Sequence, residues 1–379
     1  MIDRAMIFSR AEYAERLGAV RAGMRERGID VLVLDQTEHL AYVAGWHASG
    51  SLYHACLVPL DGEPVMVLRR LDEPVFRERS WLADCVLFAD CDNAVEVVAT
   101  TLARRGWAAA RIGVELDSHY LTVQRYEALK TALPRAAWVD FSGVLRELRL
   151  RKSPQEIAYL RQAAAIADQA MREATAAVGE GRSERAAAAA ASIAFLRLGA
   201  DTGRTGPITS GRRSGSLHGS LGDHRLAPGD LLHMELVPSV HGYSARLMRP
   251  TIIGPPSREQ EETARLLIAF QDEQIAAMGP GAVARDVDRI CREQVVKAGL
   301  RDTYDNFTGY TLGYYGTPLP PRTSDFTRAF LPTAHWTLEP GMVFHMYASA
   351  RGMAFSETVL VTEGGPQRLT RLDRQLFVR

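Results

Sequence analysis

The sequence has few cysteines and no closely spaced pair of them. Its four cysteines include no CxxC pair, and none falls in a segment that resembles a site: Cys56, Cys85, Cys91 and Cys291. We therefore interpret them as reduced structural thiols, which is the usual state of cysteine in a cytosol.

An excess of charge of one sign is missing as well. Lys plus Arg and Asp plus Glu number 45 each, which gives no electrostatic reason to expect a nucleic-acid or an anionic-membrane partner. No run of about eighteen apolar residues is present. The N-terminal segment MIDRAMIFSRAEYAERL is charged where a signal peptide would be apolar. These absences favour a cytoplasmic protein whose partner is a small molecule or another protein chain.

The composition favours two folded domains. The 379 residues are 46% hydrophobic and 24% charged, which is enough apolar material for a substantial core. Residues 1–145 combine a helical pattern at 11–27 with short apolar segments that read as strands: VLVLD, HACLVPL, PVMVLRR and RIGVELDS. This alternation predicts a small α/β domain.

Residues 146–379 begin with a strong helix start. Ser153 can cap the helix, Pro154 fits its first position, and Glu156 completes a capping box. A second helix is expected after another serine cap at Ser183. Strand patterns follow, then two more helices at 257–278 and 282–298, and then the C-terminal strands; the first strands are GPITSG, DLLHMELVP and GYSARLMRPTIIG. Helices segregated from runs of strands predict an α+β domain.

Two ionisable residues share one predicted strand. His233 and Glu235 lie two apart in LLHMELVP and so point to the same face. Burying two ionisable side chains costs free energy unless each has a partner or a function. A strand at the edge of the sheet, with one face exposed to water, accounts for the pattern equally well. His218, in the Gly- and Ser-rich loop SGRRSGSLHG, is either simply exposed or an acid or base.

Three further segments hold polar candidates. Arg246 and Arg249 lie in GYSARLMRP, and one interpretation is that both are surface charges on an edge. The segment NFTGYTLGYYGTPLPPR is either a plain connection or a pocket lining with hydroxyls and rings; it holds Thr308, Tyr310 and Tyr315.

The C-terminal strand pair raises a question of orientation. Tyr347 lies on the first strand, and Ser356 and Glu357 are neighbours on the second. Because neighbours on a strand point to opposite faces, only one of these two can point inward.

Taken together, these segments resemble the creatinase/aminopeptidase P/prolidase superfamily, which has the pita-bread fold. The resemblance covers nearly the whole chain, and its motifs follow the family's order: DQTEHLAYVAGW, RKSPQEIAYLRQA, SGRRSGSLHG, APGDLLHMELVPSVHGYSARLMRP and LEPGMVFHMYAS…SETVLVTEGG. It implies an α+β protein with a creatinase-like N-terminal domain at 1–145 and a pita-bread catalytic domain at 146–379.

The metal-dependent peptidases of this superfamily resemble one another in five ligands, namely two Asp, one His and two Glu, that hold two divalent ions. The matching positions carry residues of which only one could bind a metal: Glu235, Arg246, Thr308, Tyr347 and Ser356. An arginine in the cluster repels cations, and a carboxylate-bridged metal pair requires carboxylates. The resemblance therefore implies no metal, and no other cofactor is expected.

Two metal-free branches remain. The creatinase branch has a proton-transferring histidine that matches His218, but its substrate-binding glutamate and arginine correspond to Met248 and Leu52 here. The ectoine hydrolase branch is more similar, with a glutamate matching Glu235 and motifs matching TGYTLG, LEPGMVFH and SET. The stretch GYYGTPLPPRTSDF departs from that branch, which leaves the substrate open.

The resemblance implies hydrolysis of a C–N bond in a small cyclic amidine or a related non-peptide compound. Glu235 is expected to attack the carbon or to activate water, with His218 as the proton shuttle. Glu357 is expected to pair with the substrate's amidinium. Further substrate contacts are expected from Arg246, which alternatively keeps Glu235 ionised, and from Thr308, Tyr310 and Tyr347.

A homodimer is expected, because in related enzymes the N-terminal domain of one subunit covers the site of the other. Four residues near the start of the chain would form this lid or would pack at the domain interface: Trp46, His47, Tyr53 and His54. The alternative functions are a creatinase-like amidinohydrolase, a peptide-binding relative without activity, and an Xaa-Pro peptidase.

Overall fold

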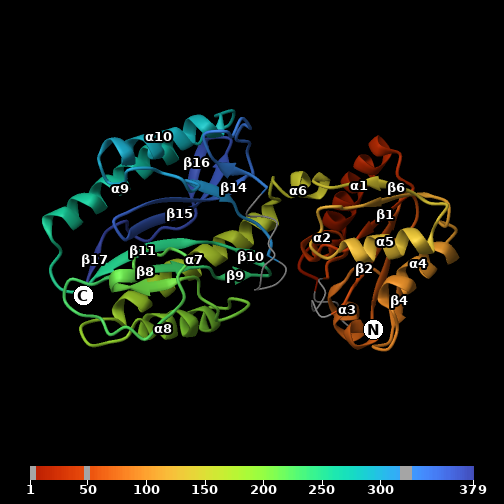
Figure 1. Cartoon of the computed structure of the whole chain (residues 1–379), viewed down its shortest axis with the longest axis horizontal. Helices are drawn as coiled ribbons and strands as arrows, with labels where there is room; N and C mark the ends of the chain where they lie inside the picture. Colours follow the sequence, from red (N-terminus) through yellow and green to blue (C-terminus); the bar gives the residue numbers. More distant parts are fainter. Residues whose placement is uncertain (1–5, 47–51, 316–326) are drawn as a thin grey trace. The chain divides into compact units, whose positions relative to one another are not determined.

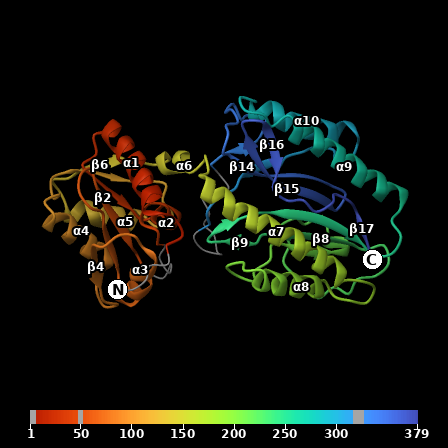
Figure 2. The same ribbon diagram turned by 180° about the vertical axis from the view of Figure 1, so that it is seen from behind.

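The structure is a computed structural model that describes residues 6–46, 52–315 and 327–379. The chain divides between Leu148 and Arg149 into two compact units, whereas the sequence places this boundary after residue 145. Each unit has its own sheets and helices (Figures 1 and 2). The predicted α+β class with two domains is thereby confirmed.

The N-terminal unit is built on a six-stranded sheet in the order β4-β3-β2-β1-β5-β6. The pairs β1–β5, β5–β6 and β3–β4 are parallel, and β1–β2 and β2–β3 are antiparallel. Its strands are β1 (Val31–Leu34), β2 (Ala55–Pro59), β3 (Val65–Arg69), β4 (Cys85–Phe88), β5 (Arg111–Val114) and β6 (Ala137–Asp140). Its helices are α1 (Arg10–Arg27), α2 (Thr37–Ala44), α3 (Glu73–Arg79), α4 (Ala94–Arg104), α5 (Val123–Ala132) and α6 (Val144–Leu148), with a short 3-10 helix at Arg70–Asp72.

Alternation along β1 builds two separate apolar layers. Leu32 and Leu34 join a core with the buried face of α1, whereas Val31 and Val33 join a second core with α4 and α5. Since successive side chains of a strand point to opposite faces, helices cover both faces of the sheet. The unit is therefore a three-layer α/β domain (Figure 1).

The C-terminal unit has two larger sheets and two helix pairs. Its strands are β7 (Ile208–Ser210), β8 (Leu231–Leu236), β9 (Ser239–Val240), β10 (Tyr243–Ser244), β11 (Leu247–Ile252), β12 (Gly309–Thr311), β13 (Ala329–Phe330), β14 (Val343–Ala350), β15 (Met353–Thr362), β16 (Gly365–Arg368) and β17 (Phe377–Val378). Its helices are α7 (Pro154–Ala176), α8 (Glu184–Arg197), α9 (Arg258–Ala276) and α10 (Ala284–Lys297), with a 3-10 helix at Gly211–Arg213. The sheet orders are β17-β11-β8-β7 and β13-β12-β14-β15-β16, beside the small pair β10-β9.

The two larger sheets meet where β11 lies against β15. The backbone amide of Arg246 donates to Oγ1 of Thr358 at 2.9 Å, and the amide of Met248 donates to Oγ of Ser356 at 2.7 Å. Helix α7 packs on the β8–β11 side, and α9 packs on β14 and β15 (Figures 1 and 2). The side chains of Thr358 and Ser356 therefore lie between the two sheets, where they accept hydrogen bonds from the backbone of the opposite sheet.

The helix starts follow the sequence only in part. The capping box of α7 is present, since Ser153 accepts from the amide of Glu156 and the Glu156 side chain accepts from the amide of Ser153. Ser183 occupies the N-cap position of α8, but its side chain makes no capping hydrogen bond. The segment predicted as one strand, GYSARLMRPTIIG, is divided into β10 and β11 because the amide of Ala245 turns to bond the carbonyl of Pro238.

Among the described helices, none combines the length and the apolar composition that a membrane-spanning segment requires.

Candidate active site

The face of β8 that carries His233 and Glu235 is buried. β8 lies between β11 and β7 in its sheet, and the two side chains are 0% and 3% exposed. The alternative of an edge strand with a wet face is therefore wrong. Buried ionisable groups are costly unless they are paired or used, so the partners of each one matter.

Glu235 is paired with Arg246. Nη1 of Arg246 donates to Oε1 of Glu235 at 3.2 Å, and both side chains are buried. The same nitrogen donates to the hydroxyl of Tyr310. The guanidinium also faces the rings of Tyr310 and Tyr315, at 5.2 and 5.7 Å from their centroids. Arg246 is thus a fixed cation inside the site and not the surface charge that the sequence suggested.

His345, on β14, extends this cluster. Its Nδ1 lies 2.9 Å from the hydroxyl oxygen of Tyr310. The same oxygen accepts from Arg246, so a hydrogen bond in which Tyr310 donates to Nδ1 corresponds to the neutral tautomer of His345 with its ring proton on Nε2. Burial, helped by the positive charge of Arg246, holds the pKa of His345 well below its ordinary value. The imidazole is therefore neutral at physiological pH.

Tyr347 joins the buried cluster to an open pocket. Its ring stacks on that of His345 with the centroids 5.2 Å apart, and its hydroxyl accepts from Nδ2 of Asn306 at 3.2 Å. Burial raises the pKa of Tyr347, the hydrogen bond from Asn306 lowers it, and the nearby carboxylate of Glu235 raises it further. Tyr347 thus feels Glu235 on one side and borders the pocket on the other.

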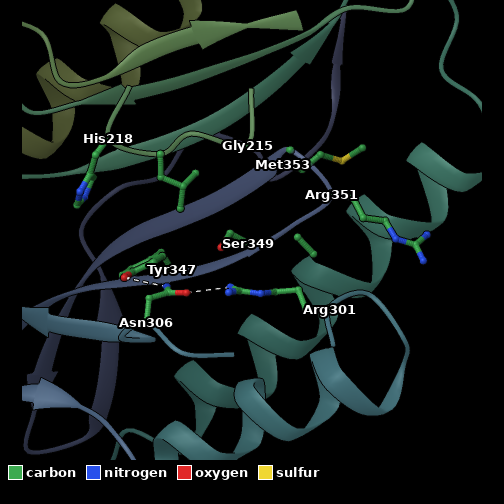
Figure 3. A pocket seen from close by; sticks show the side chains of 11 residues that line it. Gly215, His218, Arg301, Asn306, Tyr347, Ser349, Arg351 and Met353 are labelled. Atoms are coloured by element: carbon green, nitrogen blue, oxygen red, sulfur yellow. Dashed lines mark hydrogen bonds between the residues drawn. The ribbon is translucent and has the colours of Figure 1, made fainter. Parts of the chain in front are cut away.

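The pocket has a volume of about 550 Å³, within the range of roughly 300–1,000 Å³ typical of small-molecule sites. Figure 3 shows Tyr347, Asn306 and Arg301 in a row along it, with His218 reaching in from a separate loop. The described lining is Gly215, Leu217, His218, Arg301, Asn306, Tyr347, Ser349, Ala350, Arg351, Gly352 and Met353. No acidic side chain is among these residues.

His218 is exposed on the pocket, and buried His233 feels its charge. Burial first, and then the electrostatic effect of His218, lower the pKa of His233 to about 4. Among the described groups neither ring nitrogen of His233 has a hydrogen-bond partner. His233 shares its strand face with Glu235.

Two residues predicted to contact substrate have other partners. Thr308 is fully buried, donates from Oγ1 to Asp288 at 2.6 Å and accepts from Gln274 at 2.9 Å. The residue that meets the Arg246 cluster is instead its near neighbour Tyr310. Tyr310, and not Thr308, therefore contacts the buried pair of Glu235 and Arg246.

Glu357 also lies outside the cluster. It is 0% exposed, it accepts from Nη2 of Arg249 at 2.7 Å, and Thr370 donates to its other oxygen. On the paired strands Ser356 stands opposite Tyr347, whereas Glu357 stands opposite Met346. Ser356 therefore shares the face of Tyr347, and we correct the expected substrate contact of Glu357 to an internal ion pair.

The described lid candidates are buried within the N-terminal unit. Trp46 packs edge-on against Phe76 in its core. His54 lies with Nε2 3.2 Å from Asp72 and Nδ1 2.7 Å from the carbonyl of Leu52. Tyr53 is 3% exposed. Their rings fill the unit's own core and offer no open face to a ligand; His47, the fourth candidate, is outside the described residues.

The side chains present do not fit a two-metal centre. Within residues 6–46, 52–315 and 327–379, no group of three or more His, Cys, Asp or Glu side chains is placed to hold a metal ion. The one carboxylate of the cluster, that of Glu235, is bound by the guanidinium of Arg246. An arginine at this distance already compensates the charge of the carboxylate and disfavours a divalent ion beside it.

The chain is similar to known proteins over almost its whole length. Residues 158–363 match the model of metallopeptidase family M24, and residues 16–151 match the creatinase/prolidase N-terminal domain. Ectoine hydrolase from Halomonas elongata is 27% identical over the whole of both chains. An Xaa-Pro dipeptidase from Pyrococcus furiosus is 28% identical, covering 96% of this chain and 99% of its own.

Solved structures agree on the fold. The prolidase from Pyrococcus horikoshii superposes with a TM-score of 0.82 at 22% identity, covering 96% of this chain and all of its own. The chain therefore belongs to metallopeptidase family M24, and its architecture is that of the M24 prolidases. The relatives named above are hydrolases, which supports a hydrolase here.

Proposed function

We propose that the protein is a metal-independent hydrolase that cleaves a C–N bond of a small cyclic amidine or a related non-peptide compound. The observation that carries the proposal is the buried ion pair of Glu235 with Arg246 at the centre of an M24 site. The match to ectoine hydrolase over the full length of both chains supports the same reaction class.

A fixed guanidinium suits this chemistry. Arg246 favours the ionised form of Glu235, as an opposite charge at hydrogen-bond distance does. A carboxylate held in this form can remove a proton from water or attack an electrophilic carbon directly. Glu357 is fully buried in its pair with Arg249, whereas the charge of Glu235 reaches Tyr347, which lines the pocket. Glu235 is therefore the carboxylate that acts on the substrate.

Two side chains, Glu235 and His218, carry the protons of the proposed reaction. Glu235 takes one proton from water while the water oxygen bonds to the amidine carbon. The C–N bond then breaks, and the departing nitrogen receives a proton carried by His218, which lies on the open pocket. The hydroxyl of the adduct becomes the carbonyl of the product, and its proton passes to the released amine, which leaves as an ammonium ion. Transfer of the first proton from Glu235 back to His218 restores both groups, and Tyr347 offers its hydroxyl as a hydrogen-bond donor beside the reacting carbon.

The test is mass spectrometry of ectoine, 5-hydroxyectoine and creatine after incubation with chelator-treated protein. We expect one of the two ectoines to gain one water. Release of urea from creatine would move the assignment to a creatinase-like amidinohydrolase.

A second candidate function is an Xaa-Pro peptidase, which the Pyrococcus furiosus relative favours. It requires divalent metal in this family's mechanism, and the described residues do not supply the ligands. If none of the three small compounds changes, while added Mn²⁺ makes the protein release amino acids from Xaa-Pro dipeptides, the proposed function is wrong.

A further inference from the structure

The pocket beside Tyr347 carries positive groups without negative ones. Arg301, Arg351 and His218 line it, and no Asp or Glu belongs to the described lining. A concave site with this charge favours an anion over a cation or a neutral compound. The two arginines differ, however, in what already occupies their guanidinium groups.

Arg351 is already engaged elsewhere. It forms an ion pair with Glu259 and donates from Nη2 to the carbonyl of Gly299 at 3.0 Å. Figure 3 shows its side chain directed away from Asn306. Its charge is therefore neutralised outside the pocket.

Arg301 is held in place but is not neutralised. Its Nη1 donates to Oδ1 of Asn306 at 2.9 Å, and its guanidinium lies 4.2 Å from the ring centroid of Tyr304. Among the described residues it forms no ion pair with a carboxylate. Arginine has five N–H donors, and here only one has a partner among the described groups. The others are free to bind a carboxylate with two parallel hydrogen bonds.

Asn306 fixes the distance between this arginine and the reacting groups. It accepts from Arg301 through Oδ1 and donates to Tyr347 through Nδ2. The guanidinium and the tyrosine hydroxyl are therefore separated by one amide group and two hydrogen bonds (Figure 3). A compound of the size of an amino acid can span this gap, with one end at Arg301 and the other at Tyr347.

We infer that Arg301 is a specificity-determining residue that binds a carboxylate of the substrate. The inference rests on the proposed function for the identity of the other end of the substrate, which faces Glu235. The substrate class is then a small zwitterion, in which a cationic C–N centre and a carboxylate are separated by only a few bonds.

Binding is measured by calorimetry with three carboxylates, namely ectoine, creatine and glycyl-L-proline. The proteins are the unmodified chain, Arg301→Gln and the control Arg351→Gln, which removes a pocket-lining arginine that is already paired. We expect at least one compound to bind, and its affinity to fall about tenfold or more in Arg301→Gln, the loss expected for a charge-assisted hydrogen bond. In Arg351→Gln we expect a change of less than about twofold. For ectoine, 2-methyl-1,4,5,6-tetrahydropyrimidine, which lacks the carboxylate, should bind equally to all three proteins.

The outcomes separate this inference from the proposed function. If binding depends on Arg301 but ectoine is not hydrolysed, the carboxylate site is supported and the proposed reaction is wrong. Turnover with equal affinities in Arg301→Gln and Arg351→Gln overturns the carboxylate site and leaves the reaction standing. If no carboxylate binds more tightly to the unmodified chain than to a folded Arg301→Gln variant, the inference is wrong.

Discussion

Nη1 of Arg246 lies 3.2 Å from Oε1 of Glu235, and both side chains are buried at the junction of the two C-terminal sheets. In a family named for its metallopeptidases, this ion pair provides a cation that is part of the polypeptide. The contacts of the pair with Tyr310, and through it with His345, make it the organising feature of the site.

The first prediction concerns Glu235. The Glu235→Gln variant keeps the shape and one hydrogen-bond acceptor for Arg246 but removes the charge needed for attack or proton removal. We expect kcat for ectoine to fall by about a hundredfold or more, while circular dichroism still shows a folded protein. Turnover close to that of the unmodified protein would remove Glu235 from the mechanism.

The second prediction concerns Glu357, which the structure places in an internal ion pair. Replacing it with Gln leaves buried Arg249 without its counter-charge, a loss that typically costs about 3–5 kcal/mol of stability. Chemical denaturation should show this loss, whereas kcat and KM of the protein that remains folded should stay within about threefold of the original values, a range of less than 1 kcal/mol. A stable Glu357→Gln variant without activity would instead place Glu357 at the substrate.

The third prediction concerns the hydroxyl of Tyr310. In Tyr310→Phe, Nδ1 of His345 loses its partner and Arg246 loses an acceptor. The loss of a hydrogen-bond partner by a buried polar group lowers the free energy of unfolding by about 1–3 kcal/mol. We also expect kcat to fall, because Arg246 is held less firmly against Glu235. Thr308→Val serves as the comparison, since its hydroxyl bonds Asp288 and Gln274 and its loss should affect stability without lowering kcat. Equal losses of kcat in both variants would contradict this division.

The fourth prediction is a pH dependence of stability. The pKa of buried His233 is lowered from its ordinary 6.5 to about 4, so between these values the unfolded chain binds more protons at this position than the folded one. Stability should therefore fall as the pH drops from about 6.5 to 4, by about 3 kcal/mol from this group. Buried His345 acts in the same direction.

The variant His233→Phe isolates this contribution, because phenylalanine does not titrate and both ring nitrogens of His233 lack a described partner. Urea denaturation of both proteins at several values of pH between 4 and 7 measures the difference. The variant should show a shallower loss in acid. An unchanged slope would mean that His233 does not titrate as proposed.

The local patterns of the sequence were sufficient for most of the fold. The capping box at Ser153 and the alternation of VLVLD follow from short-range chemistry, and both are present in the structure. The break before β11 was not foreseen, because it depends on a backbone bond between Ala245 and Pro238 that no propensity encodes.

The position of a site residue could be predicted only where it follows from the alternation of side chains along a single strand. The common face of His233 and Glu235 follows from a period of two. The partners of Glu357 and Thr308 come instead from Arg249 and Asp288, far away in the sequence. His345 was missed, although it stands two residues before Tyr347 and so on the same face. Arg301 had no sequence signal, because its pocket is formed by segments that are distant in the chain.

The most direct test of the account is the rate of ectoine hydrolysis by protein that has been treated with chelator and dialysed, with its metal content measured by mass spectrometry in the same sample. We expect an unchanged rate at a metal content far below one ion per chain, because Arg246 supplies the positive charge of the site. A rate that disappears with the metal and returns on addition of Mn²⁺ or Zn²⁺ would contradict it.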